Sequence, residues 1–233
     1  MKNNKKYFNI PITMLKELHT DSEKFFHEVF KVGTYLYSKT LTGAEVKRYN
    51  DAKDYLGINQ SYSASTGISV AKEVLDSIPS KYPIVGIDKM MLFDYQDNEK
   101  SEYDNICLSA FLGIKSIIGK KPYDKTNKDF INARMFGYAS TKVLPAELTP
   151  LQLKYKKRYH MDKVLLSLQN DWHLKMISHN SRGMYVSYDL SLDELAIIIV
   201  KNKQDTKAQQ LRDDKKNAIE KAQQHISDSI TTA

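Results

Sequence analysis

The segment from residue 106 to residue 189 constrains the fold most, because its expected elements come in an informative order. Three helices are expected over 106–119, 127–136 and 150–172, where apolar residues recur at helical spacing. Two β-prone runs follow, and they flank a turn at 180–183 that is rich in turn-forming residues. The segment therefore predicts three helices followed by a β-hairpin.

Elsewhere the sequence predicts further helices, one N-terminal strand and a polar tail. Residues 7–12 alternate and are β-prone, but Pro11 restricts them to an edge strand or an extended arm. Beyond residue 201 the chain is polar and is expected to be partly helical, over 206–226. Further helices are expected over 22–39, 43–55, 68–78, 87–95 and 190–200, with an extended stretch at 81–86.

These elements predict a mainly α fold with a small β-hairpin, in the α+β class. The polar run 96–102 is a natural linker, and 233 residues suffice for one large domain or two small ones. We therefore expect an N-terminal helical domain over 7–98 and a second domain over 103–200. A polar, partly helical C-terminal tail is expected over 201–233.

The net charge of +7 favours polyanionic partners, but its size alone is weak evidence. Only five of the 35 basic residues are Arg, and the others are Lys. Lys, Asn, Ile and Tyr all have AT-rich codons, so an AT-rich genome accounts for much of this bias without any ligand. Where the charges lie is therefore more informative than how many there are.

Several classes of protein are disfavoured by what the sequence lacks. No apolar run approaches the roughly 20 residues that span a bilayer, and the N-terminus has no signal-peptide pattern, so no membrane partner is expected. The lone Cys107 indicates a reducing, cytoplasmic setting. The six histidines are scattered, and no glycine-rich phosphate loop is present. We therefore expect no metal, no cofactor and no catalytic residue.

Residues 129–143 carry the sharpest local pattern. Ala133 is a small residue that lets two helices approach, and Gly137, four residues later, makes the turn between them. In this register Ser140 caps the next helix and Val143 packs into the core. The pattern resembles the helix-turn-helix signature. Pro145 departs from it, so the long helix from residue 150 is an alternative second helix, with 141–148 as an enlarged turn.

The long helix opens with a basic and aromatic run, and the hairpin after it is also basic. Together with the order of elements, this resembles winged helix-turn-helix domains over residues 106–189. The resemblance implies a winged-helix-like domain over 103–200 that contacts phosphates and base edges of double-stranded DNA. A solvated basic face is the alternative. The residues expected to contact DNA are Lys142, Lys154, Lys156, Lys157, Arg158, His160, Lys175 and Arg182.

The expected function is that of a non-enzymatic double-stranded DNA-binding protein. A transcriptional regulator or a plasmid or phage replication or partition factor fits this description. The alternative is a structural or assembly protein, such as a virion or scaffold component, whose positive charge is incidental. A third alternative is an enzyme whose site is too dispersed to see. The apolar helix around 25–37 either joins two copies into a homodimer or packs into the core.

Overall fold

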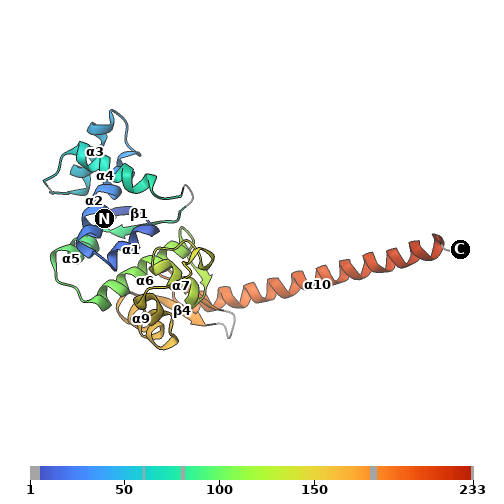
Figure 1. Cartoon of the computed structure of the whole chain (residues 1–233). Helices are drawn as coiled ribbons and strands as arrows, with labels where there is room; N and C mark the ends of the chain where they lie inside the picture. Colours follow the sequence, from blue (N-terminus) through green and yellow to red (C-terminus); the bar gives the residue numbers. More distant parts are fainter. Residues whose placement is uncertain (1–5, 60, 80–81, 179–182, 232–233) are drawn as a thin grey trace. The chain divides into compact units, whose positions relative to one another are not determined.

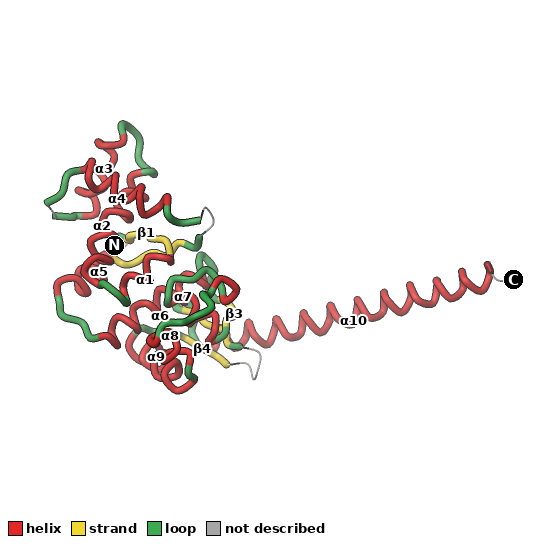
Figure 2. Tube along the Cα trace, in the orientation of Figure 1, coloured by secondary structure: helices red, strands yellow, loops and turns green. Residues whose placement is uncertain are grey.

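The computed structural model describes residues 6–59, 61–79, 82–178 and 183–231, with the backbone alone for residues 222 and 224–231. The chain divides into two compact units, Met1–Tyr188 and Asp189–Ala233. The expected fold class is confirmed: helices dominate, and the described residues form two small antiparallel sheets (Figure 2).

The first half of unit 1 is built on a two-stranded sheet. Strand β1 (Tyr7–Pro11) pairs antiparallel with β2 (Ile84–Asp88), and Tyr7 lies opposite Asp88. The expected strand at 7–12 is therefore confirmed. The helix expected over 87–95 begins only at Lys89, because Ile87 is buried in β2. The helical elements of this half are η1 (Ile12–Met14), α1 (Leu15–Leu18), α2 (Ser22–Ser38), α3 (Glu45–Leu56), α4 (Ala64–Asp76) and α5 (Lys89–Asp97) (Figure 1).

Helix α2 lies inside unit 1, between the small sheet and its neighbouring helices. The Asp21 side chain accepts a hydrogen bond from the Lys24 amide and caps its N-terminus. Phe25, Phe30 and Val32 have no exposed surface, and Phe30 packs edge-on against Phe8 of β1. The apolar face of α2 is therefore core, and it offers no surface on which a second copy could dock.

The second half of unit 1 follows the predicted order of elements with two differences: a short strand is added after the first helix, and the third predicted helix is divided in two. Strand β5 pairs antiparallel with β3 on one side and with β4 on the other. The hairpin expected at 174–188 is therefore confirmed as β4 and β5. The elements are α6 (Glu102–Ile118), β3 (Asp124–Thr126), α7 (Lys128–Met135), η2 (Thr141–Val143), α8 (Pro150–Lys156), α9 (Arg158–Asp171), β4 (Lys175–Ser178) and β5 (Met184–Ser187).

The buried core is continuous through both halves of unit 1. Helix α6 lies at its centre: it contacts β2 of the first half and α7, α9 and β5 of the second half. One cluster of buried apolar side chains extends from Phe8 to Val186. The linker expected at 96–102 coincides with the turn between α5 and α6, and the division of the chain into domains there stays a prediction.

Unit 2 contains one helix, α10 (Leu192–Thr231), which is 40 residues long. The sequence predicts a helix over 190–200 and a separate helical stretch over 206–226, and this break is wrong. No Gly or Pro occurs between Leu192 and Thr231, so nothing in the backbone interrupts the helix. Within the described ranges, no helix combines the length and apolar character required to cross a membrane.

Candidate functional site

The positive charge of the chain is concentrated in one stretch of unit 1. Residues 120–188 contain 13 basic and 5 acidic side chains, a formal charge of +8, so the rest of the 233 residues sums to −1. This stretch runs from β3 to β5. A local excess of this kind creates a positive potential that attracts polyanions, which a charge spread evenly over the surface does not.

The basic run lies at a corner between two helices. The predicted helix over 150–172 is broken, because Lys157 has an extended backbone (φ −68°, ψ 134°) that ends α8 and begins α9. If the helix were continuous, Tyr155 would share one face with Arg158 and Asp162, which are polar. The break turns the chain so that Tyr155 and Met161 are both buried.

The four basic residues at this α8–α9 corner are all exposed, but they differ in their partners. Lys154 Nζ lies 3.3 Å from a Glu102 carboxylate oxygen, and Arg158 Nε lies 3.6 Å from Asp162. Lys156 and Lys157 have no ion-pair partner within the described part of the chain. The corner therefore presents two uncompensated ammonium groups between two weakly paired cations.

Three of the other predicted contact residues lie on η2, α9 and β4. Lys142 is exposed in η2, and Lys175 is half-buried on β4. The His160 imidazole is half-buried, and its ring centroid lies 5.9 Å from that of Tyr155 and 5.3 Å from that of Tyr159. Arg182 lies outside the described residues.

The local features expected at Ala133 and Gly137 are present, whereas those expected after Gly137 are not. Ala133 is fully buried, and Gly137 has φ +78°, the left-handed conformation expected after a helix end. The Ser140 hydroxyl caps only the short η2 turn, by accepting from the Lys142 amide at 3.3 Å. Val143 is 51% exposed, so the expected core contact is wrong. Pro145 prevents a second helix here, and the next one begins at Pro150.

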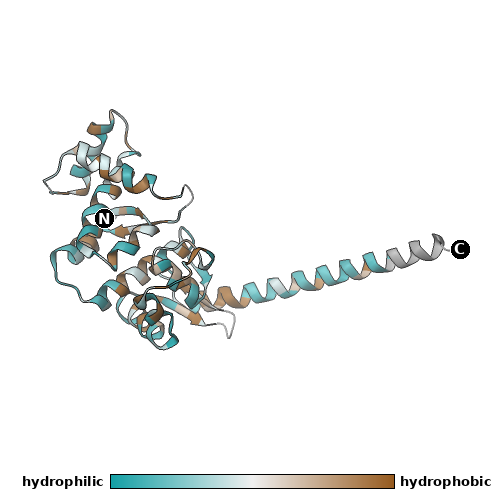
Figure 3. Ribbon diagram, in the orientation of Figure 1, coloured by the Kyte–Doolittle hydropathy of each residue, from teal (hydrophilic) through white to brown (hydrophobic). Residues whose placement is uncertain are grey.

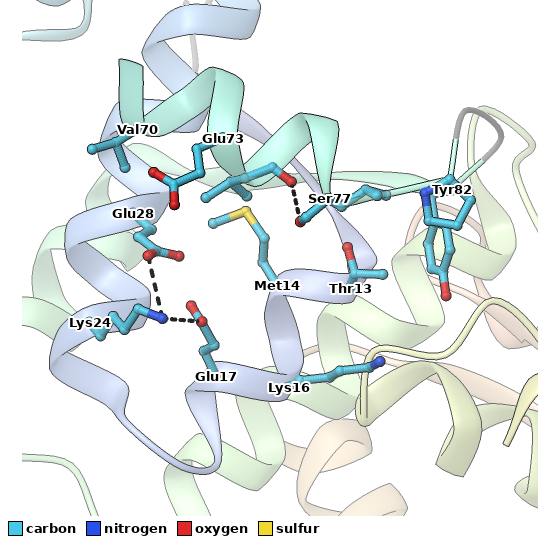
Figure 4. Close-up of a pocket in the computed structure, with 13 residues that line it drawn as sticks. Thr13, Met14, Lys16, Glu17, Lys24, Glu28, Val70, Glu73, Ser77 and Tyr82 are labelled. Carbon is cyan, nitrogen blue, oxygen red and sulfur yellow. Dashed lines mark hydrogen bonds and ion pairs between the residues drawn. The ribbon is translucent and has the colours of Figure 1, made fainter. Parts of the chain in front are cut away.

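A second polar site lies in a pocket of about 610 Å³ lined by residues of η1, α1, α2 and α4. Lys24 Nζ donates a 2.6 Å hydrogen bond to Glu17 and lies 3.6 Å from a Glu28 oxygen (Figure 4). The Glu73 carboxylate and the Met14 side chain complete this end of the pocket. One ammonium group is thus shared by two carboxylates.

This arrangement shifts the pKa of Glu28. Burial raises the pKa of the Glu28 carboxyl to about 7, and a hydrogen bond and negative charge from Glu17 act in the same direction, while Lys24 opposes them. The hydrogen bond to Glu17 also raises the pKa of Lys24. Sequence reasoning missed this site, because Glu17 and Glu28 belong to different helices and no spacing rule connects them.

The pocket also has two hydroxyl groups in its lining, those of Thr13 and Ser77. The Ser77 hydroxyl donates a 2.7 Å hydrogen bond to the Val74 carbonyl oxygen, and Cys107 lies buried in α6, outside the pocket. Across the described ranges, no three His, Cys, Asp or Glu side chains come together as potential metal ligands. The corner offers charge for binding, and the pocket offers a titratable group.

Comparison with known proteins gives no further guidance, because no family model, no curated protein and no solved structure matches this chain.

Proposed function

We propose that this chain binds double-stranded DNA without catalysing a reaction, and that the α8–α9 corner and the β4–β5 hairpin contact the duplex. The observation that carries the proposal is the concentration of charge: residues 120–188 hold +8, and the remainder of the chain holds −1. Phosphate contacts supply most of the affinity of such proteins for duplex DNA.

The order of elements in the same stretch supports this proposal. Helix α6, strand β3, helix α7, the α8–α9 pair and the β4–β5 hairpin follow one another, with the strands in the order β3-β5-β4. Three helices followed by a hairpin is the order of the winged helix-turn-helix domains that the sequence resembles; here the third helix is divided into α8 and α9, and β3 is an additional strand. In such domains a helix enters the major groove while the wing contacts the adjacent backbone.

The exposed side chains of the corner suit phosphate contacts. Lys156 and Lys157 have no ion pair to break before they bind, and the Arg158 side chain is 88% exposed. Tyr159 beside them is also exposed. Binding would therefore break few existing contacts within the protein, and it would release counterions from the duplex.

The test is the affinity of a random-sequence duplex for the triple variant Lys156→Ala, Lys157→Ala and Arg158→Ala. If three phosphate contacts are lost, the slope of log K against log salt should fall by about 2.7, and affinity should drop at least tenfold at moderate salt. Titration of a fluorescent duplex at several salt concentrations measures both quantities. Because all three side chains are exposed, the circular dichroism spectrum and melting temperature should stay unchanged.

A matched control removes the same charge elsewhere. The variant Lys16→Ala, Lys39→Ala and Lys47→Ala changes three exposed lysines of the first half of unit 1, outside the α8–α9 corner and outside α10. It should retain the wild-type slope. Equal losses in both variants would show that total charge, rather than the corner, governs binding. Failure of the wild-type chain to bind duplex even at low salt would favour an assembly protein instead.

A further inference from the structure

Helix α10 carries an apolar stripe along one face. The members of the stripe are separated by steps of four, four and three residues, so the pattern repeats every 11 residues. Eleven residues correspond to three turns at 3.67 residues per turn, close to the 3.6 of a straight α-helix, so the stripe stays on one face. Its described members from the second turn onward are Ile197, Val200, Gln204, Ala208, Leu211, Lys215 and Ile219.

The apolar members of this stripe are exposed to solvent. Leu211 is 55% exposed and Ile219 is 59% exposed, and Val200 and Ala208 are exposed as well. Around the stripe the helix is hydrophilic beyond its first turns (Figure 3). Burying a Leu or Ile side chain contributes roughly 1.5–3 kcal/mol, so the exposed stripe leaves a considerable stabilisation unused.

A helix of this length needs support that the described side chains do not supply. At 1.5 Å per residue, 40 residues extend for about 60 Å. Helices without a packed apolar face are marginal in water. In the part of α10 whose side chains are described, the only ion pair is that of Lys216 and Glu220 at 3.7 Å, a kind worth a few tenths of a kcal/mol.

The charges beside the stripe indicate what covers it. Along one edge lie Asp205, then Arg212 and Lys216, and along the other edge lie Lys203 and Lys207, then Asp214. Lys201 also lies on the edge of Asp205, level with Lys203, so one like-charged pair precedes the pattern; from Asp205 onward the two edges carry opposite charges at each height. When two copies pair in parallel and in register, opposite edges meet at equal height. Asp205 then faces the partner's Lys203 and Lys207, and Asp214 faces the partner's Arg212 and Lys216.

We infer that α10 pairs with α10 of a second copy of this chain, as a parallel, in-register two-stranded coiled coil. The two polar members of the stripe, Gln204 and Lys215, lower the stability of the pair but fix its register, since each meets its own counterpart. Residues 189–233 contain 7 basic and 8 acidic side chains, so their net charge is close to zero. Charge repulsion between the two copies of this segment is therefore small. Two DNA-binding units in one particle would follow, but the pairing does not depend on the proposed DNA binding.

The mass of the full chain in solution, measured by sedimentation equilibrium without DNA, tests the inference. We expect a dimer, and Leu211→Glu should raise its dissociation constant about a hundredfold or more, because two apolar side chains leave the seam and two charges enter it. Gln210→Glu adds the same charge at the neighbouring exposed position, off the stripe, and should leave the dissociation constant within about threefold of wild type. A chain that stays monomeric at its highest soluble concentration would overturn the inference, and so would equal effects of the two substitutions.

Oxidative crosslinking tests the orientation of the pair. Ala208→Cys and Leu211→Cys should each give a disulfide-linked dimer under mild oxidation, because a parallel, in-register pair places each position beside its own counterpart. An antiparallel pair can do this at only one of the two positions, so crosslinking at one position alone would overturn the parallel arrangement. The wild-type chain is the control, because its Cys107 is buried and should not crosslink.

Discussion

Helices α2 and α10 both carry apolar faces, but only α2 is covered within its own unit. Phe25 and Phe30 of α2 are fully buried against β1 and neighbouring helices, whereas Leu211 and Ile219 of α10 are more than half exposed. The stability of unit 1 is therefore intramolecular and independent of concentration. In the inferred coiled coil the cover of α10 comes from a second copy of the chain, so the order of α10 depends on concentration. Substitutions in the two helices distinguish these two kinds of stability.

The largest expected effect is that of Phe30→Ala in α2. It removes a fully buried ring that packs against Phe8, and it should lower the free energy of unfolding by about 3–5 kcal/mol. Urea unfolding followed by tryptophan fluorescence measures this, since Trp172 belongs to unit 1. Leu211→Ala is the comparison in α10 and should leave this transition unchanged. A loss of similar size for Leu211→Ala would contradict the distinction between the two helices.

Gly137→Ala tests how tightly distant segments of unit 1 fit together. Gly137 has φ +78°, and a Cβ there would lie 2.9 Å from the Thr13 carbonyl oxygen. We expect a loss of about 2 kcal/mol, from the left-handed backbone together with this contact. The control is Gly57→Ala, which has a left-handed backbone (φ +67°, ψ +47°) and whose new Cβ meets only the movable end of the Lys89 side chain. It should cost about 1 kcal/mol, and equal losses for the two variants would rule out the contact with Thr13.

Glu28→Gln should change how the stability of unit 1 depends on pH. Folding raises the pKa of Glu28 from 4.5 to about 7. As pH rises from 4.5 to 7, the Glu28 carboxyl therefore ionises in the unfolded chain before it ionises in the folded chain, and the wild-type fold loses stability over this range. The variant does not ionise and should be more stable than wild type by about 1 kcal/mol at pH 8, after solvent screening, and similar to it at pH 4. Urea unfolding at the two pH values measures the difference.

The smallest expected effect concerns the charged edges of α10. Asp214→Lys places like charges opposite Arg212 and Lys216 of the second copy, and it should raise the dimer dissociation constant about three- to tenfold, as expected for exposed pairs. Adding Arg212→Asp and Lys216→Asp restores opposite charges and should recover most of the affinity. Sedimentation equilibrium at low salt measures both variants. If the combined variant does not recover its dimer affinity, Asp214 does not face Arg212 and Lys216 of the second copy, and the parallel, in-register arrangement is wrong.

Local signals in the sequence were sufficient to place most helices and the hairpin. Asp21 and Asn127 mark helix starts, and both side chains accept hydrogen bonds from amides of the first turn. Gly137 marks a helix end and has the left-handed backbone that such an end requires. These features depend on neighbours within a few residues, so single-sequence patterns contain them.

Features that depend on distant partners could not be predicted in the same way. Strand β3 is three residues long, and it forms only because β5, 60 residues later, pairs with it at Lys125 and Tyr185. The break at Lys157 arises because Tyr155 and Met161 must both reach the core, which periodicity alone does not reveal. The Glu17–Lys24–Glu28 site requires α1 and α2 to lie side by side, and that arrangement is set by their packing.

The extended backbone at Lys157 also has a consequence for proteolysis. Trypsin cleaves after Lys and Arg and prefers accessible, non-helical chain. Lys157 is exposed and extended, and the exposed Lys156 and Arg158 beside it are the last residue of α8 and the first residue of α9. Cleavage there would separate α8 from α9 while the buried side chains on either side hold the two fragments together. The rate of this nick therefore reports on whether the α8–α9 corner is free or occupied, and it requires neither a label nor knowledge of what occupies the corner.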